Sequence, residues 1–250
     1  MGAKIKGAGS SNIEIEGVKQ LRDASYNIMP DRIEAGTFLC LAAINRSNIL
    51  IKNVNPEHII PAIDKLEEMG CKFNIQKNEI EIWTPKKLRP IDIKTMPYPG
   101  FPTDMQSIFA AVLTTVKGTS IIVENIFENR YKFIPELVRM GAKATLESRT
   151  AVIKGVKKLY GANVKATDLR GGAALVLAAT VAKGTTKVEN IEYILRGYEN
   201  FDNKLKKNQR KYYKINKLRA DNALNKNRAC PKGRNKNWQK EEKKKMICII

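Results

Sequence analysis

Apolar residues recur along the chain in three long blocks, and an aspartate precedes each block. The blocks have the Ala, Leu and Ile composition of helices that are mostly buried, and they cover residues 37–44, 108–116 and 173–181. Their aspartates are Asp31, Asp104 and Asp168, which recur at intervals near 70 residues, roughly the length expected of an internal repeat.

The segments that follow each block support the same repeat. A turn and a short apolar strand come next, at residues 48–54, 117–126 and 183–191. In the first two units a second helix then ends at a Met-Gly pair, and a paired-strand pattern closes the unit at residues 72–82 and 143–153. The pattern therefore predicts a unit of helix, strand, helix, strand and strand. In the third unit it stops after residue 207.

These boundaries predict an α/β (α+β) protein with three segments. Residues 1–29 are interpreted as the closing strand pair of a preceding unit and an extended link, and residues 30–207 as the repeat domain. Residues 208–250 form a basic low-complexity tail that we expect to be disordered or irregular. Residues 204–250 hold 17 Lys or Arg and 3 Asp or Glu, in a chain of net charge +20.

Two interpretations of this tail stay open. A basic tail could bind nucleic acid without sequence preference, through its phosphates. Alternatively, the abrupt break inside a helix and the Lys, Asn and Ile usage fit out-of-frame translation of an A/T-rich gene. A Leu/Met-Gly-Ala continuation of the repeat in another reading frame of the gene would support this interpretation.

Composition narrows the class of protein. The chain is 43% hydrophobic, but it has no apolar run of about 18 residues and no secretory signal at its start, so we expect a cytoplasmic protein without membrane contact. Its four cysteines form no close pair and it has one histidine. We therefore expect neither a metal site nor a disulfide framework, and no cofactor.

Acidic and arginine side chains at the unit ends are the candidates for chemistry. They are Asp31, Arg32, Glu34, Asp104, Arg130, Asp168, Arg170 and Arg196. If the units pack about a pseudo-threefold axis, these loops converge on one cleft, where helix N-termini and guanidinium groups favour phosphate and carboxylate. An aspartate there could take a proton from a hydroxyl. Taken singly, each aspartate could equally be a helix cap, and each arginine a solvated surface residue.

Several strings in the chain resemble one enzyme family. They are Phe-Pro-Thr-Asp-Met-Gln (101–106), Glu-Asn-Arg-Tyr (128–131), Ala-Thr-Asp-Leu-Arg (166–170), Arg-Gly-Tyr-Glu (196–199) and Pro-Asp-Arg-Ile-Glu-Ala-Gly-Thr (30–37). In order and spacing they resemble the UDP-N-acetylglucosamine enolpyruvyl transferases over residues 1–207. The resemblance implies an inside-out α/β barrel of two three-repeat domains with the active site between them. It also implies transfer of the enolpyruvyl group of phosphoenolpyruvate to the 3′-hydroxyl of UDP-N-acetylglucosamine, with release of phosphate.

The resemblance also implies roles for individual residues. Asp104 is expected to be the base near the hydroxyl and to bind the sugar nucleotide, and Ile126 to contact the uridine part. Positive charge around phosphoenolpyruvate is expected from Arg130, Arg170 and Arg196, the last of them catalytic. The remaining expected substrate-binding residues are Asp168 in the same cleft, and Asp31 and Glu34 near the interdomain link.

Departures from the family shape our expectation for this chain. The family's reactive Cys loop and active-site Lys fall before residue 1, none of the four cysteines matches that loop, and Leu195 replaces a more frequent acidic residue. We expect a C-terminal half truncated at both ends and inactive alone, because half a site cannot enclose both substrates. Pairing with a missing N-terminal half, a non-catalytic sugar-nucleotide binder and a nucleic-acid-binding protein are the alternatives.

Overall fold

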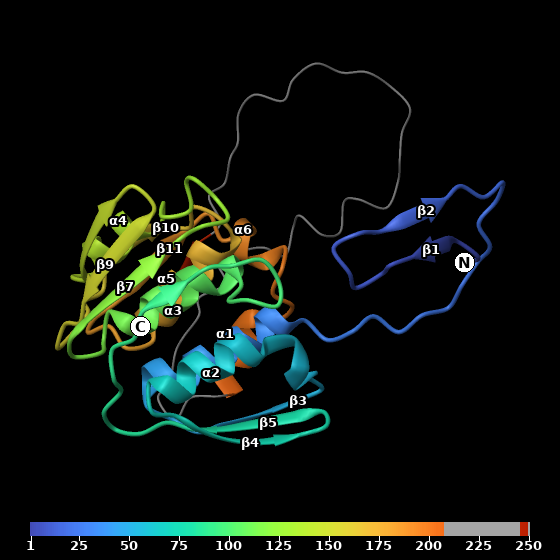
Figure 1. Ribbon diagram of the computed structural model, residues 1–250. Coiled ribbons are helices and arrows are strands. Elements are labelled where there is room, and N and C mark those ends of the chain that lie inside the picture. The colour runs from blue at the N-terminus through green and yellow to red at the C-terminus, as the bar shows by residue number, and fades with distance from the viewer. Residues whose placement is uncertain (208–245, 250) are drawn as a thin grey trace, which may run out of the picture. The chain divides into compact units, whose positions relative to one another are not determined.

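The computed structural model describes residues 1–207 and 246–249, and the chain divides into two compact units, Met1–Pro30 and Asp31–Ile250 (Figure 1). The first unit holds a hairpin of β1 (Lys4–Lys6) and β2 (Glu14–Glu16), which pair antiparallel. Its strands are joined by an ion pair in which the Lys4 ammonium lies 2.6 Å from the Glu16 carboxylate. This hairpin lies in the segment where the sequence predicts a strand pair.

Three buried helices form the centre of the second unit. They are α1 (Arg32–Asn45), α3 (Gln106–Leu113) and α5 (Leu169–Ala179), and each contacts the other two. Most of their residues are buried, because apolar side chains surround each helix instead of forming one stripe. Gly36 lets α1 pack closely against Met105, just before α3, since a Cβ atom at Gly36 would lie 2.8 Å from the Met105 sulfur.

The three helices run in the same direction. At their C-terminal ends, the Asn45 amide donates to the Thr180 hydroxyl at 2.9 Å and Arg46 donates to the Thr115 carbonyl at 3.1 Å. At their N-terminal ends, Arg170 of α5 donates to Asp104, just before α3, at 3.4 Å. The helix starts therefore gather at one end of the unit, as the pseudo-threefold arrangement predicts.

Three sheets lie around these helices (Figure 1). The first has the order β3-β5-β4, with β3 (Ile49–Lys52), β4 (Lys72–Gln76) and β5 (Glu79–Trp83). The second has the order β6-β7-β9-β8, with β6 (Ile93–Lys94), β7 (Thr119–Val123), β8 (Lys143–Glu147) and β9 (Thr150–Lys154). Alternate residues of β5 and β9 are buried, so each sheet turns one face toward the core.

The third sheet has the order β10-β11-β12, with β10 (Asn163–Lys165), β11 (Thr186–Glu189) and β12 (Met246–Ile249). Strand β12 pairs antiparallel with β11, as β5 does with β3 and β9 with β7. It lies in the segment predicted to be an irregular tail. Residues 208–245 lie outside the described residues, and so do the predictions of nucleic-acid binding and out-of-frame translation made for them.

Shorter helices complete the repeats. They are η1 (Pro56–Ile59), α2 (Ile60–Glu68), α4 (Ile134–Arg139), α6 (Glu192–Leu195) and α7 (Phe201–Lys207), and a 3-10 turn, η2 (Thr103–Met105), precedes α3. The predicted order of helix, strand, helix, strand and strand is confirmed in the first two repeats. Within the described residues, every helix is too short or too polar to cross a membrane.

Candidate active site

Two of the three aspartates at the helix starts cap their own helices. Asp31 accepts hydrogen bonds from the backbone N–H groups of Ile33 at 2.7 Å and Glu34 at 3.2 Å. Asp168 accepts from the N–H groups at the start of α5, at 3.0 and 2.8 Å. Both carboxylates thus satisfy N–H groups that have no partner inside the helix.

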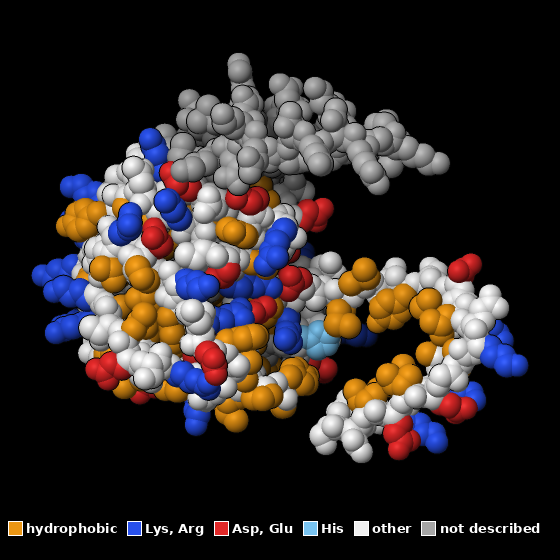
Figure 2. Space-filling view, turned by 90° about the horizontal axis from the view of Figure 1, so that it is seen from above, with side chains coloured by type: hydrophobic (Ala, Val, Ile, Leu, Met, Phe, Trp, Pro, Cys, Tyr) orange, Lys and Arg blue, Asp and Glu red, His pale blue; other side chains and the backbone are white. Residues whose placement is uncertain are grey.

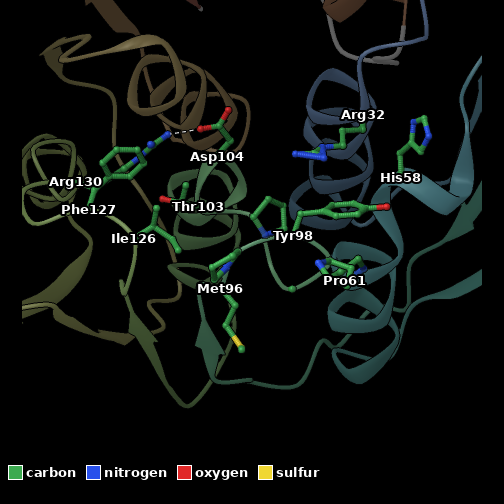
Figure 3. A pocket seen from close by; sticks show the side chains of 14 residues that line it. Arg32, His58, Pro61, Met96, Tyr98, Thr103, Asp104, Ile126, Phe127 and Arg130 are labelled. Carbon is green, nitrogen blue, oxygen red and sulfur yellow. Dashed lines mark hydrogen bonds and ion pairs between the residues drawn. The ribbon is translucent and has the colours of Figure 1, made fainter. Parts of the chain in front are cut away.

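Asp104 has a different environment. It lies inside the η2 turn, whose first residue follows Pro102, and this turn has no side-chain cap. The Asp104 carboxylate instead accepts from the Arg130 guanidinium at 2.5 Å through one oxygen (Figure 3). Its other oxygen accepts from Arg170 at 3.4 Å. Its side chain remains 39% exposed, so a ligand can reach the carboxylate. Residues from the second and third repeats therefore meet here.

Aromatic rings lie beneath both guanidinium groups. The Arg130 guanidinium lies 4.9 Å from the Phe127 ring centroid, and the Arg170 guanidinium 5.3 Å from that of Tyr198. The Nη1 atom of Arg170 is buried and has no hydrogen-bond acceptor among the described residues. Because buried donors are rarely left unpaired, this N–H group is a candidate partner for a ligand oxygen.

Tyr198 connects Arg170 with the first repeat. Its hydroxyl lies 2.8 Å from the Thr37 hydroxyl, and Thr37 gives its own proton to the Ile33 carbonyl at 2.8 Å. Tyr198 is therefore the donor to Thr37. Burial raises the pKa of Tyr198, which the neighbouring Arg170 guanidinium partly offsets. No role was predicted for Tyr198 from the sequence, although it lies in the Arg-Gly-Tyr-Glu string.

A pocket of about 420 Å³ opens beside Asp104 (Figure 3). At one end it is lined by Asp104, Arg130 and Ile126, and at the other by Arg32 and Tyr98. The Arg32 guanidinium lies 5.8 Å from the Tyr98 ring centroid. It forms no ion pair within the described part of the chain, so its charge is open to an anionic ligand.

The remaining predicted residues have separate environments. Glu34 forms an ion pair with Lys204 of α7 at 2.6 Å. Arg196 is exposed at the end of α6, and its side chain makes no ion pair or hydrogen bond to any described residue. The structure thus brings together Asp104, Arg130 and Arg170, and the role of Arg196 remains a prediction.

The described cysteines are poorly suited to nucleophilic chemistry. Cys40 and Cys71 are both buried, and burial raises the pKa of the Cys71 thiol to about 11 and that of Cys40 well above its usual value. Among the described residues, no three His, Cys, Asp or Glu side chains gather as a metal site. The chemistry available at this site is that of a carboxylate and guanidinium groups.

Glu124 is a further residue that the sequence analysis missed. It is fully buried at the end of β7 and accepts a hydrogen bond from Thr103, the neighbour of Asp104, at 2.8 Å. A Val-Glu-Asn-Ile string marks this position, but the same string recurs in the third repeat. Only the fold reveals which of the two copies lies beside the pocket.

Comparison with known proteins gives consistent results. The family model described as EPSP synthase (3-phosphoshikimate 1-carboxyvinyltransferase) matches residues 1–205. UDP-N-acetylglucosamine 1-carboxyvinyltransferase of Desulfofundulus thermocisternus is 53% identical over 207 residues, which are 82% of this chain and 85% of the relative. UDP-N-acetylglucosamine 1-carboxyvinyltransferase 1 of Caldanaerobacter subterraneus subsp. tengcongensis is 50% identical, over 86% of this chain and 52% of the relative.

Solved structures agree with these relatives. The enolpyruvyl transferase NikO from Streptomyces tendae superposes with a TM-score of 0.72 at 28% identity, over 83% of this chain and 50% of that one. EPSP synthase from Acinetobacter baumannii has a TM-score of 0.52 at 15% identity and supports the fold alone. The chain spans about half the length of several curated relatives that it matches. It belongs to the enolpyruvyl transferase family, among the UDP-N-acetylglucosamine 1-carboxyvinyltransferases.

Proposed function

We propose that this chain supplies the sugar-nucleotide side of an active site that transfers the enolpyruvyl group of phosphoenolpyruvate to UDP-N-acetylglucosamine. The acceptor is the 3′-hydroxyl of the sugar, and phosphate is released, in the synthesis of peptidoglycan precursors. The observation that carries the proposal is the position of Asp104, between Arg130 and Arg170 and beside a pocket of about 420 Å³.

The geometry suits proton removal from a hydroxyl. In the proposed reaction, the Asp104 carboxylate accepts the proton of the 3′-hydroxyl, and the hydroxyl oxygen bonds to C2 of phosphoenolpyruvate. The bond between C2 and the phosphate oxygen then breaks, and phosphate leaves. The carboxylate is partly exposed, while its two arginine partners hold it in place. A bound sugar hydroxyl can therefore reach a carboxylate whose position is fixed in advance.

Cations near the carboxylate suit the second substrate. Phosphoenolpyruvate carries a phosphate and a carboxylate, both of which match the paired N–H groups of a guanidinium. In this proposal Arg130 and Arg170 bind these groups, aided by the unpaired Nη1 of Arg170. Arg196 joins them, although the described structure gives it no partner. Preorganised charges of this kind also stabilise charge that develops during reaction.

The other predicted residues receive roles consistent with their contacts. Ile126 is 37% exposed on the pocket wall and offers an apolar surface to the uridine part. Asp168 and Asp31 support the site by capping α5 and α1, which carry Arg170 and Arg32. Glu34 acts through its ion pair with Lys204. We assign the reaction to the cytoplasm, with two small-molecule substrates and no cofactor, and with a further segment of the enzyme as the partner that encloses them.

A titration of the purified chain tests this function. Calorimetry should detect binding of UDP-N-acetylglucosamine and no binding of shikimate 3-phosphate, the acceptor named in the family description. Binding is a better readout than turnover, because the chain spans about half the length of several relatives. A preference for shikimate 3-phosphate, or no binding of either compound, would overturn the proposal.

A further inference from the structure

We propose that Glu124 is a positioning residue that fixes two walls of the pocket and thereby sets the affinity for the sugar nucleotide without touching it. The inference rests on the proposed function for its ligand, and on the hydrogen bonds of one buried carboxylate for its mechanism.

The Glu124 carboxylate accepts four hydrogen bonds from three parts of the second repeat. One oxygen accepts from the Thr95 hydroxyl at 2.9 Å and from the backbone N–H groups of Ile126 and Phe127 at 2.9 and 3.1 Å. The other oxygen accepts from the Thr103 hydroxyl at 2.8 Å. Ile126, Phe127 and Thr103 all line the pocket, so a single side chain holds both sides of it.

Thr95 extends this network. Its hydroxyl oxygen accepts from the Asn125 N–H at 2.8 Å, while the Asn125 side-chain amide donates to the Thr95 carbonyl at 3.1 Å. Both Thr95 and Glu124 have no exposed surface. The turn at residues 125–127 is therefore held on one side by Thr95, the residue after β6, and on the other by Thr103, the residue before Asp104.

Burying a carboxylate in a protein core is energetically unfavourable. Glu124 forms no ion pair with a Lys, Arg or His in the described part of the chain, and an unpaired buried charge is strongly unfavourable without hydrogen bonds. Its four donors compensate, and hydrogen bonds to a charged acceptor are shorter and stronger than neutral ones. Such a network holds its members in one arrangement, which a pocket wall requires.

The third repeat supplies a natural control. Glu189 occupies the same Val-Glu-Asn-Ile string at the end of β11, but it is only half-buried, and its side chain makes no hydrogen bond to a described residue. It lines no part of the pocket beside Asp104. The string thus has the buried network only in the repeat that carries the pocket.

Glu124→Gln and Glu189→Gln form the matched pair for the test. Glutamine keeps the shape but replaces one acceptor oxygen by an NH₂ donor. In Glu124→Gln, hydrogen–deuterium exchange without ligand should quicken at least tenfold at the Ile126 and Phe127 amides. Affinity for UDP-N-acetylglucosamine should fall at least tenfold. Glu189→Gln should leave both quantities within twofold of the unsubstituted chain.

A second pair of variants guards against a folding defect. Thr95→Val removes the hydroxyl that Glu124 binds, whereas Thr95→Ser retains it, so exchange should quicken in the first and stay near normal in the second. Unchanged exchange at Ile126 and Phe127 in Glu124→Gln, or in Thr95→Val if Glu124→Gln does not fold, would overturn the proposal. Faster exchange throughout the domain in both Glu124→Gln and Thr95→Val would also overturn the proposal. If the unsubstituted chain binds no UDP-N-acetylglucosamine, the proposed function fails, while the exchange arm still decides the positioning role.

Discussion

The starts of α3 and α5 differ in what their aspartates do. At α5, Asp168 is the residue before the helix, and its carboxylate binds the free backbone N–H groups. At α3, the 3-10 turn η2 precedes the helix, and Asp104 lies within that turn with its carboxylate directed to Arg130 and Arg170. The same residue type at the same place in a repeat thus caps its helix in one copy and accepts hydrogen bonds from two arginines in the other.

The backbone explains why the Asp104 side chain is not needed as a helix cap. The Met105 N–H donates to the Pro102 carbonyl at 2.9 Å, which closes the turn without help from a side chain. Pro102 has no N–H group of its own to satisfy. A carboxylate inside the turn, not before it, is therefore free to accept from side chains of two repeats.

The largest expected effect is on ligand binding by Asp104→Asn. Loss of a charged acceptor for the sugar hydroxyl should weaken UDP-N-acetylglucosamine binding by about 30-fold, since such hydrogen bonds contribute roughly 2 kcal/mol. The matched variant is Asp168→Asn, in which asparagine caps a helix as well as aspartate does. Calorimetric titration should find a much smaller loss of affinity in this variant, and equal losses in both variants would erase the distinction between the two helix starts.

For the free energy of unfolding, we expect the opposite order, with the larger loss on substitution of Asp168. Asp168→Ala removes a cap, so its free energy of unfolding in urea should fall by about 1 kcal/mol. Asp104→Ala should lower it by less, because Asp104 caps no N–H group and its ion pairs are partly exposed. A greater loss in Asp104→Ala than in Asp168→Ala would show that Asp104 is primarily structural.

The smallest expected effect concerns Tyr198, whose ring lies beside the Arg170 guanidinium. Tyr198→Phe removes one hydrogen bond to Thr37 and should cost at most about 1 kcal/mol of unfolding free energy near neutral pH. Because the pKa of Tyr198 is raised on folding, its contribution is complete below about pH 10, the unfolded value, and is lost as the pH rises through the folded value.

Urea unfolding at several pH values checks this sign. The difference between the unsubstituted chain and Tyr198→Phe should shrink as the pH rises above about 10. A difference that grows with pH would mean that the folded state stabilises the tyrosinate, contrary to its burial.

Local signals in the sequence predicted most of the fold. The apolar blocks marked α1, α3 and α5, and the capping rule anticipated Asp31 and Asp168. Partners distant in sequence were harder to foresee. Tyr198 meets Thr37 across 161 positions. No local pattern distinguishes Glu124 from Glu189, because partners 29 and 21 positions away define the buried network.

Asp104 shows where the capping rule fails, because it precedes α3 but caps no helix. Its position at the start of a helix favours a cap, and only the family resemblance singled out Asp104 from the other two aspartates as the base. The structure adds the physical reason, which is the η2 turn between Pro102 and α3. Arg196 shows the converse, because resemblance places it at the substrate while the described structure leaves its side chain without a partner.

A crystal structure of the chain with bound UDP-N-acetylglucosamine would test the central claim most directly. The account predicts the sugar in the pocket beside Ile126, with its 3′-hydroxyl at hydrogen-bond distance, roughly 2.5–3.0 Å, from the Asp104 carboxylate. A sugar bound elsewhere on the domain, with the Asp104 carboxylate still contacting only Arg130 and Arg170, would contradict it.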